Sequence, residues 1–350
     1  MPDRIDLARS RILVTGGAGF IGSNFVHEFV RRFPKSHVVV LDALTYAGRR
    51  ENLEGLAPES ITFHHGDIRD PEAVAKAMAD CDQVLNFAAE THVDRSIESA
   101  GGFVQTNVYG VFVLCEQARR NGVRRFIQVS TDEVYGEVLE GRATEDWVLR
   151  PRSPYAASKA AGDLLALAYH TTHGLPLVVS RCSNNFGPRQ YPEKLLPLFV
   201  TNAIDDESLP VYGSGRNTRD WLHVVDHCSA LIALLEQSGI EGQVFNIGAG
   251  EENDVLAITD AILRHLGKPT TLIRHVEDRP GHDRRYAVDS TRLSRLTGWA
   301  PAIPFEQGLR DTIEWYRTHE GWWRPIKQGE FREYFERMYG KRKTLKEVRA

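Results

Sequence analysis

The stretch RILVTGGAGFIGSNFV, residues 11–26, decides how this chain folds. Its β-branched start, Arg11–Thr15, predicts a strand, and the residues after the glycines predict an amphipathic helix to about Phe33. A strand, a glycine-rich turn and a helix N-terminus form a pyrophosphate cradle, because backbone N–H groups and the helix dipole face the anion. We therefore expect a dinucleotide site here. The alternative is a tight turn whose glycines serve packing alone.

The next apolar run, His37–Leu41, ends in Asp42. A carboxylate about 20 residues beyond such a loop can accept hydrogen bonds from both hydroxyls of a ribose. A carboxylate there would also repel a 2′-phosphate, which favours NAD over NADP. The alternative for Asp42 is a helix or turn cap.

Strands and helices alternate through the first half of the chain, with further strands expected at residues 61–65, 83–88, 124–129 and 177–182. This alternation predicts an α/β fold built on a right-handed, doubly wound parallel sheet. After Cys182 loop-like residues dominate, and residues 209–215 predict a turn. We expect one domain of residues 1–182, to which residues 223–247 return, and a smaller, mixed substrate-binding lobe of residues 183–222 and 248–350.

Polar residues follow the apolar run Phe126–Val129, in the sequence STDEVYG of residues 130–136. They are expected at the carboxyl end of a parallel strand, which is where open sheets of this class bind ligands. Thr131, Asp132 and Glu133 bring acid–base capacity to this edge. The alternative for the two carboxyls is a polar helix start. His92 and Asp94, which follow another strand, are either site residues or buried polar groups with partners.

Tyr155 and Lys159 are spaced i, i+4 in the helical pattern of residues 153–173, so they project from one face. A Lys ammonium beside a phenol favours the phenolate and lowers the pKa of the Tyr from about 10 toward neutrality. Such a base can deprotonate a sugar hydroxyl as a hydride leaves.

Composition narrows the classes of function. The chain has 350 residues, of which 42% are hydrophobic and 26% charged, and a formal net charge of −4. These values are ordinary for a globular enzyme and do not indicate a nucleic-acid partner. The four cysteines lack disulfide or metal-ligand spacing and fit a reducing compartment. No signal peptide and no apolar run of the ~18 residues of a membrane span is apparent. We expect a cytoplasmic protein with no metal site and no membrane partner, and residues 341–349 as a solvated tail.

Longer stretches resemble the extended short-chain dehydrogenase/reductases and, within them, the dTDP-glucose 4,6-dehydratases. They are TGGAGFIGSNFV (15–26), LDALTYAG (41–48), GDIRD (66–70), AAETHVDRSI (88–97), VSTDEVYG (129–136), SPYAASKAA (153–161), SRCSNNFGP (180–188), PEKLLPL (192–198), RDWLHVVDHC (219–228) and DRPGHDRRYAVD (278–289). The glycine loop and Tyr-x-x-x-Lys mark the superfamily, whereas Thr-Asp-Glu distinguishes dehydratases from the related epimerases. The resemblance implies a Rossmann-type fold, NAD as cofactor, dTDP-glucose as substrate and a homodimer through two helices per subunit.

By motif position the resemblance also implies the site residues. The expected cofactor contacts are Gly16, Gly19, Phe20, Ile21, Gly22, Asp42, Ala43, Leu44, Thr45, Asp67, Ile68, Phe87, Ala88, Ala89, Thr106, Tyr155, Lys159 and Asn185. The expected substrate contacts are Thr91, Thr131, Asn184, Lys194, Leu195, Leu196, Pro210, Tyr212, Arg219, Asp278, Arg279 and His282, with Arg219 as the best candidate for the diphosphate.

The same resemblance assigns roles to five catalytic residues. Tyr155 takes the proton of the glucose 4-hydroxyl while a hydride passes from C4 to NAD+, Lys159 holds the ribose, and Thr131 hydrogen-bonds the same sugar oxygen. Glu133 then removes the C5 proton, Asp132 protonates the departing C6 hydroxyl, and the hydride returns to C6. Two adjacent carboxyls in a dry pocket separate their titrations, so one can stay neutral while the other is charged.

Two other functions stay open. A dehydratase or epimerase for a UDP-sugar or another NDP-sugar would keep the cofactor site and change the base pocket. A nucleotide-sugar-binding protein without turnover is the third reading, although the intact catalytic set argues against it. The chain departs from the family pattern near Gly248, where Asn253 stands two residues early and Val255 takes the place of an Asn that reaches the nucleotide, and at Arg189, where an aromatic or small polar residue is common.

Overall fold

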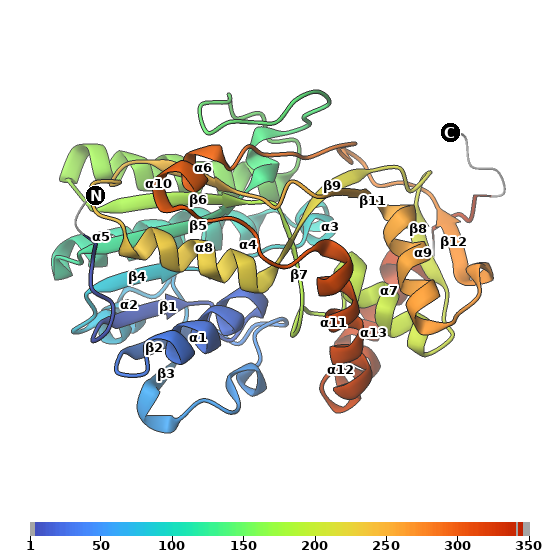
Figure 1. Cartoon of the computed structure of the whole chain (residues 1–350), viewed down its shortest axis with the longest axis horizontal. Coiled ribbons are helices and arrows are strands. Elements are labelled where there is room, and N and C mark those ends of the chain that lie inside the picture. The colour runs from blue at the N-terminus through green and yellow to red at the C-terminus, as the bar shows by residue number, and fades with distance from the viewer. Residues whose placement is uncertain (1–3, 341, 346–350) are drawn as a thin grey trace.

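A parallel sheet forms the centre of the larger lobe in this computed structural model, which describes residues 4–340 and 342–345 (Figure 1). Among these residues seven strands pair in the order β10-β6-β5-β4-β1-β2-β3. Their bounds are β1 Arg11–Thr15, β2 His37–Asp42, β3 Ile61–His65, β4 Gln83–Asn86, β5 Arg125–Thr131, β6 Leu177–Cys182 and β10 Val244–Ile247. The strand order reverses between β1 and β4, which opens a crevice at their carboxyl ends. The expected doubly wound α/β fold is confirmed.

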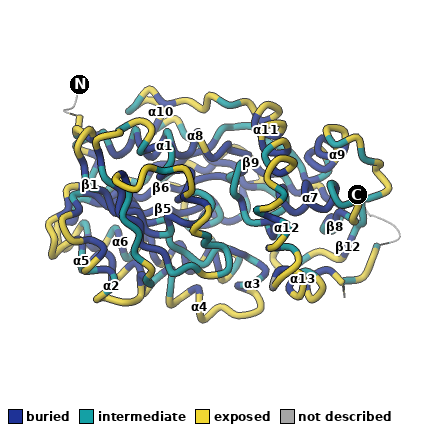
Figure 2. Tube along the Cα trace, turned by 90° about the horizontal axis from the view of Figure 1, so that it is seen from below, coloured by how far each residue is buried: buried dark blue, intermediate teal, exposed yellow. Residues whose placement is uncertain are grey.

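Helices cover both faces of this sheet. On one face lie α1 (Phe20–Arg32), α8 (Val224–Glu236) and α10 (Thr291–Thr297), and on the other α2 (Pro71–Met78), α5 (Val111–Asn121) and α6 (Pro154–His173). Because side chains alternate along a strand, Val38 and Val40 of β2 pack into the first layer and Val39 and Leu41 into the second. Figure 2 shows the strands as the buried centre of this lobe.

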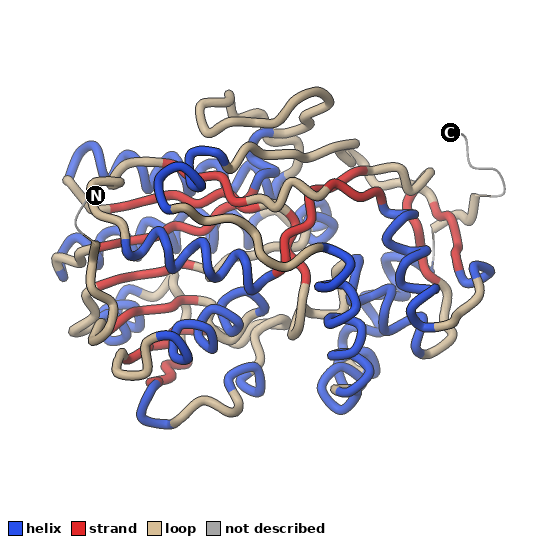
Figure 3. Tube along the Cα trace, in the orientation of Figure 1, coloured by secondary structure: helices blue, strands red, loops and turns tan. Residues whose placement is uncertain are grey.

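The smaller lobe is mixed, as expected. Its strands β7 (Asn184–Phe186), β9 (Thr218–His223) and β11 (Glu252–Asp254) form one sheet, and β8 (Leu209–Tyr212) pairs in parallel with β12 (Ile273–Val276). Its helices are α7 (Leu195–Ile204), α9 (Val255–Leu266), α11 (Phe305–Thr318), α12 (Glu320–Gln328) and α13 (Glu330–Phe335). Figure 3 shows β8 and β12 away from the large sheet and β7 and β9 next to its end.

Two expectations about the second half differ from the structure. The turn expected over residues 209–215 is wrong in its first half, because Leu209–Tyr212 pairs with a strand far along the chain that no local pattern reveals. The segment of α10 was expected in the smaller lobe, yet its Leu293 and the following Trp299 belong to the core that holds α1 and α8. Helical periodicity shows that a face is buried and does not show against which lobe.

Short helical segments connect these elements. They are α3 (Val93–Glu98), α4 (Gly101–Val104), the π-helical η3 (Gln105–Gly110) and η6 (Glu336–Gly340), and the 3₁₀ turns η1 (Arg50–Leu53), η2 (Pro58–Ser60), η4 (Asp132–Tyr135) and η5 (Thr270–Leu272). The π-helical η3 lies between α4 and α5, and it carries Thr106. Such wide turns recur at functional sites.

The described helices include none that is both long and apolar enough to cross a lipid bilayer. The four cysteines are free and buried. Of the expected tail, Lys341 and residues 346–349 lie outside the described residues. Arg342 does not fit a solvated tail, because its guanidinium lies over the ring of Tyr212 at 4.5 Å from the centroid.

Candidate active site

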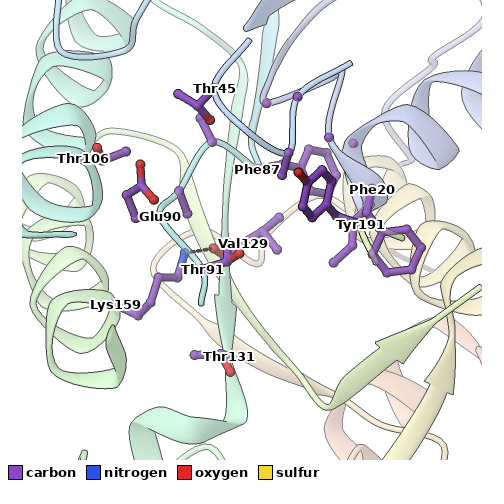
Figure 4. A pocket seen from close by; sticks show the side chains of 18 of the residues that line it. Phe20, Thr45, Phe87, Glu90, Thr91, Thr106, Val129, Thr131, Lys159 and Tyr191 are labelled. Atoms are coloured by element: carbon purple, nitrogen blue, oxygen red, sulfur yellow. Dashed lines mark hydrogen bonds between the residues drawn. The ribbon is translucent and has the colours of Figure 1, made fainter. Parts of the chain in front are cut away.

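A cavity of about 310 Å³ opens at the carboxyl ends of the central strands of the large sheet (Figure 4). Every expected cofactor residue lines it except Leu44, and so do the five expected catalytic residues. Leu44 takes part through its backbone: it has a φ of 48°, and its N–H donates to the Asp42 carboxylate at 2.8 Å. Leu44 therefore shapes the turn beside the cavity through its backbone, while its side chain does not line the cavity.

The glycine loop leaves room that no other residue type would leave. A Cβ on Gly22 would lie 2.2 Å from the Gly16 carbonyl oxygen, and one on Gly16 would lie 2.7 Å from the Ala88 nitrogen. The chain therefore needs glycine to bring β1, the start of α1 and the end of β4 this close together. The result is a helix N-terminus open to a ligand, as a dinucleotide pyrophosphate requires.

Asp42 satisfies both readings that the sequence left open. Its two carboxylate oxygens accept from Ala18 N at 2.9 Å and Leu44 N at 2.8 Å, which is the role of a turn cap. Each oxygen keeps a second lone pair, so the carboxylate can still accept from ribose hydroxyls. Burial raises the pKa of Asp42, and the two backbone N–H groups oppose this by favouring the charged form.

The Thr-Asp-Glu triplet begins where β5 ends and η4 starts. Thr131 Oγ1 accepts from Glu133 N at 3.3 Å and donates to Asp132 Oδ1 at 3.3 Å, whereas Asp132 Oδ2 is buried without a hydrogen-bond partner. The hydroxyl therefore fixes the turn that aims both carboxyls. The polar helix start is also real, because η4 begins at Asp132.

The two adjacent carboxyls have different surroundings. Burial, and then the neighbouring charges of Glu133 and Asp220, hold the pKa of Asp132 well above its usual value. Burial also raises the pKa of Glu133, but the positive charges of Arg279, Arg219 and Lys194 work against that rise. Asp132 is therefore the better proton donor of the pair and Glu133 the better base.

Tyr155 and Lys159 come from the first turns of α6. Ser153 caps this helix, its hydroxyl accepting from Ala156 N at 3.1 Å, and Pro154 occupies the first helical position. Lys159 Nζ donates to the Val129 carbonyl at 2.6 Å, drawn as a dashed line in Figure 4. The helix start thus holds both side chains against β5.

The expected lowering of the Tyr155 pKa is wrong for this arrangement. Burial raises the pKa of Tyr155 well above its usual value, and the negative charges of Glu133 and Cys182 add to this rise. A hydrogen bond with Thr131 lowers the pKa. The i, i+4 spacing puts Lys159 on the same helix face, but its ammonium is engaged with the Val129 carbonyl. Spacing in the sequence cannot reveal that competing acceptor.

A second cavity of about 160 Å³ adjoins the first and shares Glu133, Asn184, Glu193 and Lys194 with it. Of the expected substrate residues it adds Leu195, Pro210, Tyr212, Arg219, Arg279 and His282. Thr91 and Thr131 line the first cavity only. The two cavities together form one path from the triplet to the smaller lobe.

Two expected substrate residues do not line either cavity. Leu196 is 1% exposed and belongs to the core of the smaller lobe, because the residue after Leu195 on α7 points to another side of the helix. Asp278 accepts a hydrogen bond from His282 Nδ1 at 2.7 Å, so it orients His282, which does line the second cavity. The position of a motif in the sequence does not show which side chains of the segment face the cavity.

Three cations line the second cavity: Arg219 is buried, and Lys194 and Arg279 are half-buried. Lys194 donates to the Thr91 carbonyl at 3.0 Å, and Arg219 donates to the carbonyls of residues 218, 283 and 284 and not to a carboxylate. Arg279 has an acidic neighbour in Asp94, at 3.7 Å. Backbone carbonyls hold a guanidinium in place without cancelling its charge, so this part of the path suits an anion such as a diphosphate.

The sequence missed several lining residues. The first cavity also has Tyr46, Glu90, Arg69 and Tyr191, and the second also has Trp221, Phe199 and Tyr339. Val255, noted above as a departure from the family pattern, lines the second cavity too. His92 and Asp94, left open above, are both buried and line the second cavity. Tyr339 stands near the end of the chain, and its ring stacks on Tyr212 with centroids 5.8 Å apart, so only the three-dimensional fold identifies it.

Comparisons with known proteins agree with this geometry. The model of the GDP-mannose 4,6-dehydratase family matches residues 13–312. A dTDP-glucose 4,6-dehydratase of Streptomyces niveus is 52% identical over 91% of this chain and 96% of that protein, and the low-salt glycan biosynthesis protein Agl12 of Haloferax volcanii is 52% identical over 87% and 98%. The crystal structure of the dTDP-glucose 4,6-dehydratase DesIV from Streptomyces venezuelae, with NAD and TYD bound, superposes with a TM-score of 0.88 at 48% identity and covers 91% of this chain and all of that one. The chain belongs to the GDP-mannose 4,6-dehydratase family and, within it, is similar to the dTDP-glucose 4,6-dehydratases, as its motifs indicate.

Proposed function

We propose that the protein is a dTDP-glucose 4,6-dehydratase that forms dTDP-4-keto-6-deoxyglucose and water, with NAD as a recycled cofactor. One observation carries the proposal: Thr131, Asp132 and Glu133 line the same cavity as Tyr155 and Lys159, next to the glycine cradle. Redox chemistry needs the tyrosine and lysine, and elimination needs two carboxyls. Only a reaction with both parts uses the whole set. The named relatives and the NAD-bound neighbour structures support it.

The residues of the first cavity fit NAD. The glycines of residues 16–22 would hold the pyrophosphate, Asp42 the adenosine ribose, and Thr106 and Asn185 the nicotinamide side of the cavity. Lys159 would reach the second ribose. When bound, NAD+ supplies a hydride acceptor for C4, a donor for C6 and a positive ring that favours the phenolate of a nearby tyrosine.

The protein's own groups then perform the proton transfers. Tyr155 accepts the proton of the 4-hydroxyl, and Thr131 places the same oxygen by a hydrogen bond. The resulting ketone acidifies C5, whose proton Glu133 removes, and C5 is reprotonated when the hydride returns to C6. Asp132, neutral because it is buried beside another carboxyl, gives its proton to the C6 hydroxyl as water leaves.

The lining of the second cavity supports a place for the substrate. The sugar would lie at the residues that both cavities share, with the diphosphate at Arg219 and Arg279 and the base beyond them, near Tyr212 and Pro210. This order follows from the chemistry of the lining, which runs from acids through cations to aromatic and apolar side chains.

Product analysis tests the proposal. Purified protein incubated with dTDP-glucose should yield a 4-keto-6-deoxy sugar nucleotide, detected by mass spectrometry as loss of one water, with no net accumulation of NADH. Recovery of unchanged or C4-epimerised sugar would refute it, and tight binding without any turnover would instead support the non-catalytic reading.

A specific observation keeps a UDP-sugar or another NDP-sugar as the second candidate. Val255, which replaces the usual Asn of the family pattern, lines the second cavity, so this position offers no amide to the base. Comparing kcat/KM for dTDP-glucose and UDP-glucose decides between the two. A higher kcat/KM for UDP-glucose would change the proposed substrate and leave the proposed reaction type unchanged.

We propose the remaining expectations in the same way. An apolar face of Val104, Tyr109, Phe112 and Leu164, each between 39% and 58% exposed, supports a homodimer through helices α5 and α6, which sedimentation velocity tests. Four free, buried cysteines support a reducing, cytoplasmic location, which fractionation of cells tests.

The proposed domain division stays as expected from the sequence, except that residues 291–299 join the dinucleotide-binding lobe.

A further inference from the structure

A buried carboxylate stands one helical turn beyond Lys159. Asp163, on α6, is fully buried, and its Oδ2 accepts from Ser130 Oγ at 2.9 Å and from Arg181 Nε at 3.0 Å. Its Oδ1 is buried without a hydrogen-bond partner. Asp163 does not line either cavity and has no part in the steps above.

This carboxylate joins the two halves of the candidate active site. Ser130 is the last residue before Thr131 on β5, and Asp163 follows Lys159 on α6. The Ser130–Asp163 hydrogen bond therefore fixes the strand end that carries the elimination acids against the helix that carries the redox pair. The hydrogen bond from Lys159 to the Val129 carbonyl is a second link between α6 and β5.

The third partner, Arg181 on β6, is itself held on its other side. Its NH1 donates to the Tyr135 hydroxyl at 3.0 Å, and that hydroxyl donates to Asn246 Oδ1 at 2.7 Å. Arg181 is 2% exposed, so its charge and that of Asp163 form a pair that solvent does not screen. The network is completely internal, which a surface ion pair would not be.

Asp163 also acts on the charge of Lys159. Burial lowers the pKa of Lys159, and the negative charge of Asp163 is the largest effect that raises it, followed by Cys182 on β6. The charged groups that face Asp163 are Arg181 and Lys159, and Ser130 is its neutral partner. A buried lysine without a nearby anion loses its proton easily.

We propose that Asp163 is a positioning residue that keeps Lys159 as the ammonium ion and locks α6 to the end of β5, so that one carboxylate sets both the charge of the redox pair and its distance from the Thr131–Glu133 triplet. The reaction to which this applies rests on the proposed function. The effect on Lys159 itself does not, because NAD binding reports it without any sugar.

The central variant is Asp163→Asn, which keeps the size of the side chain and removes its charge. Without the carboxylate, Lys159 releases its proton at lower pH, so NAD affinity and kcat/KM should decline from a lower pH than in the wild type. We expect the alkaline limb of both profiles to move down by about one pH unit, which is a tenfold change at a fixed pH on that limb.

Two further variants separate charge from folding. Ser130→Ala removes the hydrogen bond and keeps the carboxylate, so it should reduce kcat without moving the alkaline limb. The double variant Asp163→Asn/Arg181→Met removes both buried charges and leaves no unpaired guanidinium. It should therefore fold even if the single variant Asp163→Asn does not, and the alkaline limb of its pH profiles should still be shifted to lower pH.

Asp226→Asn is the matched control. Asp226 is also a buried aspartate on a helix, α8, where it accepts from the backbone N–H groups of Ala302 and Ile303 at 3.1 and 2.9 Å. Its loss should lower the melting temperature and leave the alkaline limb in place. An unshifted limb for NAD binding in both Asp163 variants would overturn the proposal, whereas absence of dTDP-glucose turnover in the wild type would overturn the proposed function alone.

Discussion

At the residue scale, the account depends on two neighbouring carboxyls with different tasks. Asp132 and Glu133 are adjacent in the chain, but Glu133 faces Arg279, Arg219 and Lys194, and Asp132 has an oxygen without a partner. The difference between them therefore comes from the smaller lobe, which supplies the cations. The sequence predicted the triplet and different protonation states for its two carboxyls, but it did not predict the cations that cause the difference.

Variants of Glu133 and Tyr155 should fail at different steps. Glu133→Gln cannot remove the C5 proton, so it should still oxidise C4 and show NADH absorbance that persists. Tyr155→Phe cannot accept the hydroxyl proton and should show no such absorbance, with kcat reduced by about 10² to 10⁴. Stopped-flow absorbance after mixing with dTDP-glucose distinguishes them. Loss of the same step to the same degree in both would contradict the division of roles.

The raised pKa of Asp132 has a consequence for stability. A carboxyl whose folded pKa exceeds its unfolded pKa stabilises the fold fully below the unfolded value, about 4, and loses that contribution as pH rises through the folded pKa. The side chain of the Asp132→Asn variant does not titrate. The melting temperature of this variant should therefore rise relative to that of the wild type as pH increases from about 4 to 8. Scanning calorimetry across this range measures it, with the exposed Asp260→Asn as control. A constant difference between Asp132→Asn and the wild type would mean that Asp132 titrates normally.

At the element scale, the glycine loop is the feature that the sequence predicted best. Its strand, turn and helix are contiguous, so local pattern determines them. The lobe boundary at α10 and the strand β8 were missed because their partners lie far along the chain. For the same reason the sequence did not reveal Tyr339 as a residue of the second cavity.

Gly22→Ala tests the cradle. Its Cβ would lie 2.2 Å from the Gly16 carbonyl oxygen, so the loop backbone must move away from the pyrophosphate position. We expect NAD affinity, measured by calorimetry, to decrease by more than about tenfold, or 1.4 kcal/mol. Gly321→Ala on α12 is the control, because a Cβ there meets nothing within 4 Å. It should leave NAD binding unchanged and stabilise the helix by about 0.5–1 kcal/mol. Normal NAD affinity in the Gly22→Ala variant would contradict the claim that the glycine loop binds the NAD pyrophosphate.

The C-terminal segment should take part in substrate binding. Tyr339 of η6 lines the second cavity and stacks on Tyr212, while Arg342 covers the same ring. Tyr339→Ala should raise KM for dTDP-glucose by about 3- to 10-fold, as loss of an aromatic contact of about 0.5–1.5 kcal/mol implies, with kcat and NAD affinity little changed. Trp147→Ala, at an exposed aromatic that lines neither cavity, is the matched control. Equal KM values for the two variants would exclude Tyr339 from the site.

At the scale of the whole molecule, the cofactor cavity belongs to the large sheet and the substrate cavity to the smaller lobe, and they meet at Glu133 and Lys194. The sequence predicted most of the residues that line the two cavities, because the motifs lie at strand ends that the fold brings together. It could not predict the pKa of Tyr155, which depends on burial and on the acceptor that Lys159 finds.

The central claim is that one hexose meets the redox pair and both carboxyls without leaving the site. The most direct measurement uses dTDP-glucose with deuterium at C4, followed by NMR of the product. The account predicts that the deuterium appears at C6 of a 4-keto-6-deoxy sugar. Deuterium that stays at C4, or that is lost from the sugar, would contradict it.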